Sequence, residues 1–192
     1  MSRHALATLT AIAVAGLIVV AVGFEVDHAV RSLGLPLTNA AVIRQQAAEK
    51  HLDPALIAAV IYAETKFDPR PSVAGAQGLM QILPGTAYYI AHLSGGSSFT
   101  AGDLATPSIN VAYGSYYLRY LLDYYNGNEM LALAAYNGGQ TNVNQWLARA
   151  NGSGRALTVS AIPFAQTRAY VERVLAAQQA YRATYPHQLG LQ

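Results

Sequence analysis

Apolar residues in this chain recur mostly at helical spacing. Beyond residue 37 they repeat every three or four positions, in short segments that end at Gly, Pro or Asn. No alternating apolar and polar run is longer than four residues, so we expect no substantial strand. The pattern predicts an all-α fold of many short helices. Their expected spans are residues 38–51, 54–66, 86–93, 107–125, 129–135, 142–149 and 164–183.

The N-terminal segment has a different pattern. Residues 5–24 carry no charge and are apolar except for two Thr and two Gly residues. About 20 residues of helix span the hydrocarbon core of a bilayer. Arg3 precedes this segment and acidic residues follow it, which predicts export of the rest of the chain. We expect an uncleaved membrane anchor. A signal peptide cleaved near Ala21-Val22-Gly23 is the alternative.

Length and composition limit the remaining possibilities. A chain of 192 residues allows one ordinary domain with a short appendage, and 53% apolar against 11% charged residues argues against disorder. The net charge of +2 is too small for a nucleic-acid-binding surface, so no nucleic acid partner is expected. The absence of cysteine excludes disulfides, thiolate metal sites and thiol nucleophiles. The five His residues lack metal-ligand spacing, and we expect neither a metal nor a cofactor.

The chain therefore divides into four expected parts. These are a membrane anchor or signal peptide at 1–24, a spacer at 25–37, the functional domain at 38–185 and a tail at 186–192.

Among the ten acidic residues, Glu64 has the most unusual position. It follows Val60 by four residues and Ile61 by three, which places its carboxyl group on the apolar face of a helix. Burial there disfavours the charged form and raises the pKa, as a general acid at neutral pH requires. A structural carboxylate, neutralised by an Arg or hydrogen-bonded as a buried anchor, is the alternative.

Four sequence motifs follow one another along the chain from Glu64. They occupy residues 64–69 with 75–87, 107–118, 132–139 and 162–171. The first contains Gly-Ala-Gln-Gly-Leu-Met-Gln, and the third contains Ala-Ala-Tyr-Asn-Gly-Gly. In this order the motifs closely resemble those of lytic transglycosylases of the soluble-transglycosylase (SLT) type, glycoside hydrolase family 23, which are related to goose-type lysozyme. The resemblance covers about residues 38–183.

The resemblance implies a lysozyme-like domain of short helices around a sugar-binding cleft, preceded here by the hydrophobic N-terminal helix. It implies an enzyme that cleaves the β-1,4 bond between N-acetylmuramic acid and N-acetylglucosamine in peptidoglycan and forms a 1,6-anhydromuramyl product. Glu64 would act first as acid and then as base. Peptidoglycan strands and the membrane would be the partners of an expected monomer in the cell envelope, facing outward or secreted. A hydrolytic muramidase and a non-catalytic wall-binding or scaffold protein are the alternatives.

The resemblance also assigns roles to individual residues. Substrate contacts are expected for Ser72, Met80, Gln81, Tyr136, Asn137 and Tyr170, and structural roles for Gly75, Gly78 and Asn110. Met80 and Tyr136 could instead be packing residues. Three positions depart from the family pattern: Thr65 replaces Ser, Gln166 replaces Glu, and Thr106 replaces Asp.

Two further features bear on this interpretation. No second carboxylate shares the helix face of Glu64, which suits an internal sugar nucleophile, although Asp68 or Asp103 could fold into the cleft. A tyrosine stripe also runs along residues 113–124 at helical spacing. We expect these rings to belong mainly to the core rather than to a sugar-binding surface.

Overall fold

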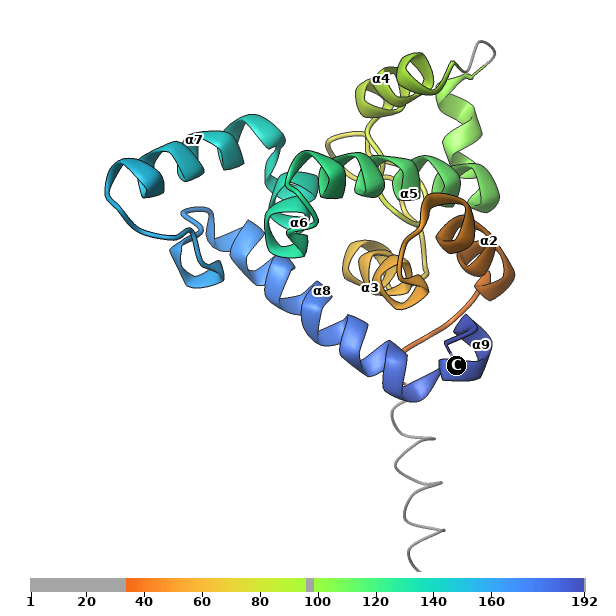
Figure 1. Cartoon of the computed structure of the whole chain (residues 1–192). Coiled ribbons are helices and arrows are strands. Elements are labelled where there is room, and N and C mark those ends of the chain that lie inside the picture. The colour runs from red at the N-terminus through yellow and green to blue at the C-terminus, as the bar shows by residue number, and fades with distance from the viewer. Residues whose placement is uncertain (1–33, 96–98, 192) are drawn as a thin grey trace, which may run out of the picture. The chain divides into compact units, whose positions relative to one another are not determined.

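The computed structural model describes residues 34–95 and 99–191, and a compact unit begins at Leu37 (Figure 1). The described residues form helices joined by loops and contain no β-strand, only the isolated bridge between Gln77 and Ile82, which confirms the all-α prediction. The α-helices are α2 (Ala40–Lys50), α3 (Pro54–Thr65), α4 (Pro84–Ser94), α5 (Pro107–Tyr124), α6 (Glu129–Gly138), α7 (Gln140–Gly152), α8 (Ala165–Thr184) and α9 (Pro186–Leu189). Two 3-10 helices, η1 (Ala101–Ala105) and η2 (Val159–Ala161), lie between them.

The expected membrane segment at residues 5–24 lies outside the described residues. Within 34–95 and 99–191, every helix is too short or too polar to cross a membrane.

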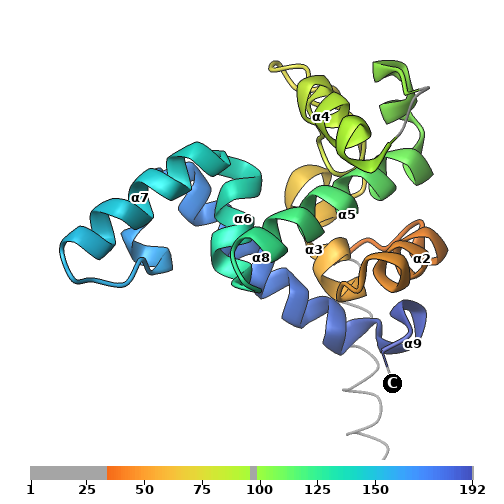
Figure 2. The same cartoon turned by 45° about the horizontal axis from the view of Figure 1, so that its top comes forward.

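Helix α3 forms the centre of the domain. Every residue from Ala55 to Ile61 is buried, because this stretch consists only of Ala, Leu, Ile and Val. The helix packs along α8 on one side and contacts α2 on another (Figure 1). Helix α5 packs against both α2 and α6, and α4 and α7 lie to opposite sides of α6 in both views (Figure 2).

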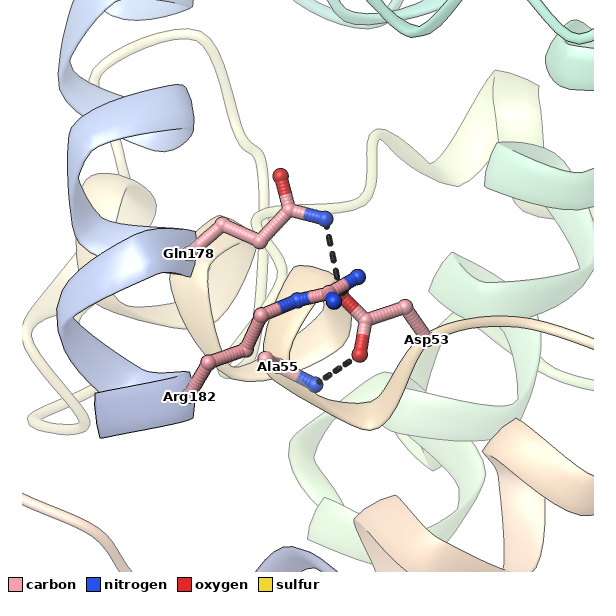
Figure 3. A network of polar contacts seen from close by, with 4 residues as sticks. All are labelled: Asp53, Ala55, Gln178 and Arg182. Atoms are coloured by element: carbon pink, nitrogen blue, oxygen red, sulfur yellow. Dashed lines mark hydrogen bonds and ion pairs between the residues drawn. The ribbon is translucent and has the colours of Figure 1, made fainter. Parts of the chain in front are cut away.

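The start of α3 follows from its sequence. The Asp53 carboxylate accepts a hydrogen bond from the Ala55 backbone N–H at 3.0 Å, and Pro54 occupies the first helical position, as predicted. The same carboxylate accepts bonds from Gln178 at 2.7 Å and Arg182 at 2.9 Å, both on α8 (Figure 3). The cap therefore also fastens α3 to α8.

Several helix ends differ from the expected spans, and α4, α6 and α7 each extend one to three residues beyond an expected end. Helix α2 begins at Ala40 rather than at the expected residue 38, after Asn39, whose φ of 56° is left-handed. The Thr38 hydroxyl accepts a hydrogen bond from the Asn39 side chain. Within the expected tail, residues 186–189 form the short helix α9, because Pro186 suits a first helical turn and Leu189 is buried.

The tyrosine stripe on α5 is not core, contrary to the sequence prediction. Tyr124 is 48% exposed, and the other stripe residues are half-buried: Tyr113, Tyr116, Tyr117 and Tyr120. The core face of α5 is formed instead by Leu118, Leu121 and Leu122, so the tyrosine rings are left on a surface.

Candidate active site

Glu64 lies in the last turn of α3, where the chain turns sharply into the glycine-rich segment. Lys66 and Phe67 adopt left-handed backbone angles, with φ of 51° and 64°. The Thr65 hydroxyl lies within hydrogen-bonding distance of the Ile61 and Leu79 carbonyls, at 3.1 Å and 2.9 Å. This contact ties the end of α3 to the glycine-rich segment, so the hydroxyl retained at residue 65 has a structural use.

A pocket of about 340 Å³ opens beside Glu64. It is lined by Ala63, Glu64, Thr65, Lys66, Asp68, Arg70 and Gln81. Burial raises the pKa of Glu64 to about 7, and Tyr170 and Arg173 oppose this rise. No cation lies within ion-pair distance of the Glu64 carboxyl among the described residues. The carboxyl group can therefore be protonated or ionised near neutral pH.

The Tyr170 hydroxyl faces Glu64 from α8. Tyr170 is 3% exposed, and its hydroxyl makes no hydrogen bond of ordinary geometry to the described residues. Tyr170 nevertheless lowers the pKa of Glu64, so its hydroxyl lies near enough to favour the ionised carboxylate. Burial and the charge of Glu64 raise the pKa of Tyr170 well above its usual value, so the phenol keeps its proton. Tyr170 is thus a buried neighbour of the carboxyl group rather than a residue on an open surface.

Asn110 organises the glycine-rich segment. This fully buried amide accepts from the Met80 N–H at 2.8 Å and donates to the carbonyls of Gln77 and Leu104, at 2.8 Å and 3.1 Å. Gly78 passes directly over it with a φ of 72°, and a Cβ at this position would overlap the Asn110 side chain. A buried residue on α5 therefore sets the shape of the segment beside Glu64.

Met80 lies beneath the pocket rather than in it. Its side chain is fully buried and fills the space that a Cβ on Gly114 would occupy. Its carbonyl accepts a hydrogen bond from the Tyr136 hydroxyl at 2.9 Å. Burial first and the nearby charge of Glu64 second raise the pKa of Tyr136 well above its usual value.

The other expected contacts are distributed differently. Gln81 lines the pocket and donates to the carbonyls of Arg70 and Gly78, at 3.1 Å and 3.0 Å. The Ser72 hydroxyl accepts from the Ala76 N–H at 2.9 Å, a contact within the loop, and Gly75 lies exposed in the same turn. Asn137 accepts from the Thr167 hydroxyl at 2.9 Å, which joins α6 to α8.

Sequence reasoning missed Arg173. It is not among the residues expected at the site, but its guanidinium reaches the Ala63 carbonyl at 3.4 Å and lowers the pKa of Glu64. The sequence signal that could have identified it is spacing, because Arg173 follows Tyr170 by three residues and so lies on the same face of the helix.

Of the two other acidic candidates, only Asp68 reaches the pocket. Its exposed carboxylate pairs with Arg70 at 2.8 Å. Asp103 forms a capping box with Thr100 at the start of η1 and lies outside the pocket lining. In the described part of the chain, no group of three His, Asp or Glu side chains could hold a metal ion.

A row of tyrosine rings leads away from the site. The Tyr136 and Tyr117 rings lie 5.5 Å apart, and Tyr117 stacks on Tyr120 at 6.2 Å with 12° between the ring planes. The Tyr120 hydroxyl meets that of Tyr89 on α4 at 3.2 Å. These four residues, which we call the tyrosine row, join α6, α5 and α4 across the surface beside Glu64.

Known proteins are similar to this chain in sequence and in fold. The chain is 33% identical over 150 residues to the soluble lytic murein transglycosylase of Escherichia coli K12, which covers 77% of this chain and 23% of that protein. It is 39% identical over 103 residues to a transglycosylase of Enterobacteria phage PRD1, covering 53% of this chain and 35% of that protein. The chain therefore spans only about a quarter to a third of the length of these relatives.

Two solved structures share the fold. The 70 kDa soluble lytic transglycosylase of E. coli superposes with a TM-score of 0.76 at 31% identity, covering 84% of this chain and 26% of that one. An inactive mutant of lytic transglycosylase Slt from Pseudomonas aeruginosa gives 0.73 at 32% identity, covering 79% and 25%. Residues 41–158 match the family model described as the transglycosylase SLT domain. The chain therefore belongs to the transglycosylase SLT domain family.

Proposed function

We propose that this protein is a peptidoglycan lytic transglycosylase. It would cleave the β-1,4 bond between N-acetylmuramic acid and N-acetylglucosamine and form a 1,6-anhydromuramyl end. One observation carries the proposal. Glu64 lies in a pocket with its pKa raised to about 7 by burial, so a single carboxyl group can give and take a proton near neutral pH.

The proposed reaction uses Glu64 twice. The protonated carboxyl group donates its proton to the glycosidic oxygen, and the bond from that oxygen to the muramyl anomeric carbon breaks. The resulting carboxylate then takes the proton of the muramyl C6 hydroxyl as that oxygen bonds to the anomeric carbon. The ring closes, Glu64 regains its proton, and no water is consumed.

The surroundings of Glu64 support both steps. Burial favours the acid needed first, whereas Tyr170 and Arg173 favour the carboxylate needed second. Gln81, Lys66 and Arg70 line the same pocket, and we propose that they contact the acetamido or carboxylate groups of the substrate. Met80, Gly78 and Asn110 would act from below by fixing the segment that carries Gln81.

The tyrosine row supports a polymeric substrate. Its rings are partly exposed to solvent and offer apolar faces with hydroxyl edges, which suit sugar rings. We therefore propose that a glycan strand lies across this row with its scissile bond at Glu64.

We also propose that the protein acts in the cell envelope. The uncharged segment at residues 5–24 would hold it in the cytoplasmic membrane facing outward, or would direct its secretion if cleaved. Ser72, Asn137 and Gly75 would serve the site by shaping its loop and helix ends.

Mass analysis of muropeptides tests the chemistry. The full chain is incubated with purified peptidoglycan, and the released products are separated and weighed. We expect 1,6-anhydro ends, each lighter by one water than a reducing end. Reducing ends alone would instead identify a hydrolase, in which Asp68 at the pocket rim is the candidate second carboxylate.

A further inference from the structure

A second hollow lies on the surface away from Glu64. It measures about 480 Å³ and shares no lining residue with the pocket beside Glu64. Its walls come from the end of α2 and one face of α5. The lining residues are Glu49, Lys50, His51, Tyr116, Arg119, Tyr120 and Asp123. We call it the α2–α5 hollow.

The charges in the α2–α5 hollow are balanced and partly fixed in place. Arg119 forms an ion pair with Asp123 at 2.6 Å and reaches the His51 carbonyl at 3.5 Å. Its Nε atom is buried and has no hydrogen-bond partner among the described residues, so one donor remains unused. Lys50 and Glu49 lie 3.6 Å apart. The hollow thus presents two cations and two anions on packed helices.

The α2–α5 hollow adjoins the tyrosine row. Tyr120 belongs to both, because it lines the hollow and stacks on Tyr117. Tyr117 in turn contacts Tyr136, and the charge of Glu64 contributes to raising the pKa of Tyr136. A chain of touching aromatic side chains therefore connects the neighbourhood of Glu64 to a pocket of mixed charge.

The balance of charge selects the ligand. The Lys50–Glu49 and Arg119–Asp123 pairs are partly exposed, so ligand groups of either sign can reach them. A neutral sugar carries no such groups, and a polyanion would be repelled by Glu49 and Asp123. A short peptide with free carboxylates and an amine matches both signs, and the peptide stems of peptidoglycan have this chemistry. We propose that the α2–α5 hollow binds a peptide stem of the glycan strand that lies across the tyrosine row. The choice of ligand rests on the proposed function.

Two forms of the glycan substrate test whether the α2–α5 hollow binds a peptide stem. Glycan strands with their stems are compared with the same strands stripped by an amidase, using the full chain. Lys50→Gln and Asp123→Asn each remove one charge from the hollow. We expect each to lower kcat/KM on stem-bearing strands about two- to fivefold and to leave stripped strands unaffected. Equal losses on both substrates, or no loss on either, would overturn the proposal.

A matched control and a binding measurement separate this site from the catalytic one. Arg155→Gln removes an exposed charge beyond α7 and should change kcat/KM on neither the stem-bearing nor the stripped strands.

The binding measurement uses a synthetic stem tetrapeptide, which is added to the Glu64→Gln protein while the NMR chemical-shift changes of the protein are recorded. Shifts at the α2–α5 hollow that vanish with Lys50→Gln support the site, even if wild type yields no anhydro products. Anhydro products from wild type without such shifts would refute the stem site and leave the proposed function intact.

Discussion

Helix α3 carries a carboxyl side chain at each end, and the two have opposite surroundings. Asp53 accepts hydrogen bonds from Ala55, Gln178 and Arg182, so its charge is fully partnered (Figure 3). Glu64 has no ion pair among the described residues, and burial raises its pKa to about 7. Three donors fix the Asp53 carboxylate in place as a structural joint, whereas the lack of an ion pair leaves Glu64 free to exchange a proton.

The same pair of packed helices produces both environments. Helix α8 supplies Gln178 and Arg182 to Asp53, and Tyr170 and Arg173 to Glu64. The polar joint at one end of α3 therefore sets the register of the two helices and holds the reactive group opposite its neighbours at the other end. We therefore expect substitutions of Asp53 to lower the stability of the fold and substitutions of Glu64 to lower catalytic activity.

The largest expected effect separates the two carboxyl groups by activity. Glu64→Gln should lower the rate of glycan cleavage at least about a thousandfold, because an amide cannot donate the proton. Asp53→Asn is the matched control and should keep most of its activity per folded molecule. The measurement is the initial rate of anhydromuropeptide release. Substantial cleavage by the Glu64 variant would contradict the assignment.

The second effect concerns stability. Asp53→Ala removes a helix cap and leaves the buried Gln178 amide without its acceptor, so we expect a loss of about 2–4 kcal/mol in the free energy of unfolding. Urea denaturation followed by circular dichroism measures this. Asp68→Ala, which breaks an exposed ion pair, should cost less than about 1 kcal/mol. Equal losses in the two variants would show that the α3–α8 joint does little for stability.

The third effect is a pH dependence of stability caused by Glu64. Its pKa rises from an ordinary 4.5 to about 7 on folding, so the folded chain binds this proton more tightly than the unfolded chain. The free energy of unfolding should therefore fall as pH rises from about 4.5 to about 7, by at most about 3 kcal/mol.

Comparison with Glu64→Gln isolates this contribution. The variant lacks the titrating group, so its stability relative to wild type should increase across the same interval. Denaturant titrations of both proteins at several pH values give the difference directly. A difference that stays constant from pH 4.5 to 7 would show that Glu64 is not buried as described.

The smallest effect concerns the neighbours of Glu64. Tyr170 lowers the Glu64 pKa, so Tyr170→Phe should raise it and move the alkaline limb of the activity profile upward by less than about one pH unit. Tyr125→Phe removes a hydroxyl that bonds Asn144, away from the pocket lining, and should leave the limb in place. A shift to lower pH in the Tyr170 variant would contradict its proposed support of the carboxylate.

Local rules explain which elements were predictable from sequence. Asp53 with Pro54 marks a helix start because a cap and a first-turn proline act within a few residues. Glu64 was identifiable because its spacing from Val60 and Ile61 fixes its face of the helix. The α9 helix escaped prediction because four residues have no periodicity, and its order depends on burying Leu189.

Side-chain exposure was less predictable. A tyrosine stripe at helical spacing is compatible with either core or surface, and leucines on the neighbouring face of α5 occupy the core instead. Met80 stands in a motif expected to contact substrate, but the close approach of Gly114 gives its side chain a buried space. Such outcomes depend on which faces meet, which periodicity alone does not specify.

The sequence by itself determined the all-α class, the start of α3 and the family motifs, and it predicted Glu64 among ten acidic residues as the catalytic group. The tertiary structure decided the environment of that residue. It brought Tyr170 and Arg173 from α8 and Tyr136 from α6 to one carboxyl group, and it buried Asn110 beneath the glycine-rich segment. The physical reason is that a pKa and a pocket depend on distances between residues far apart in the chain, and packing alone sets those distances.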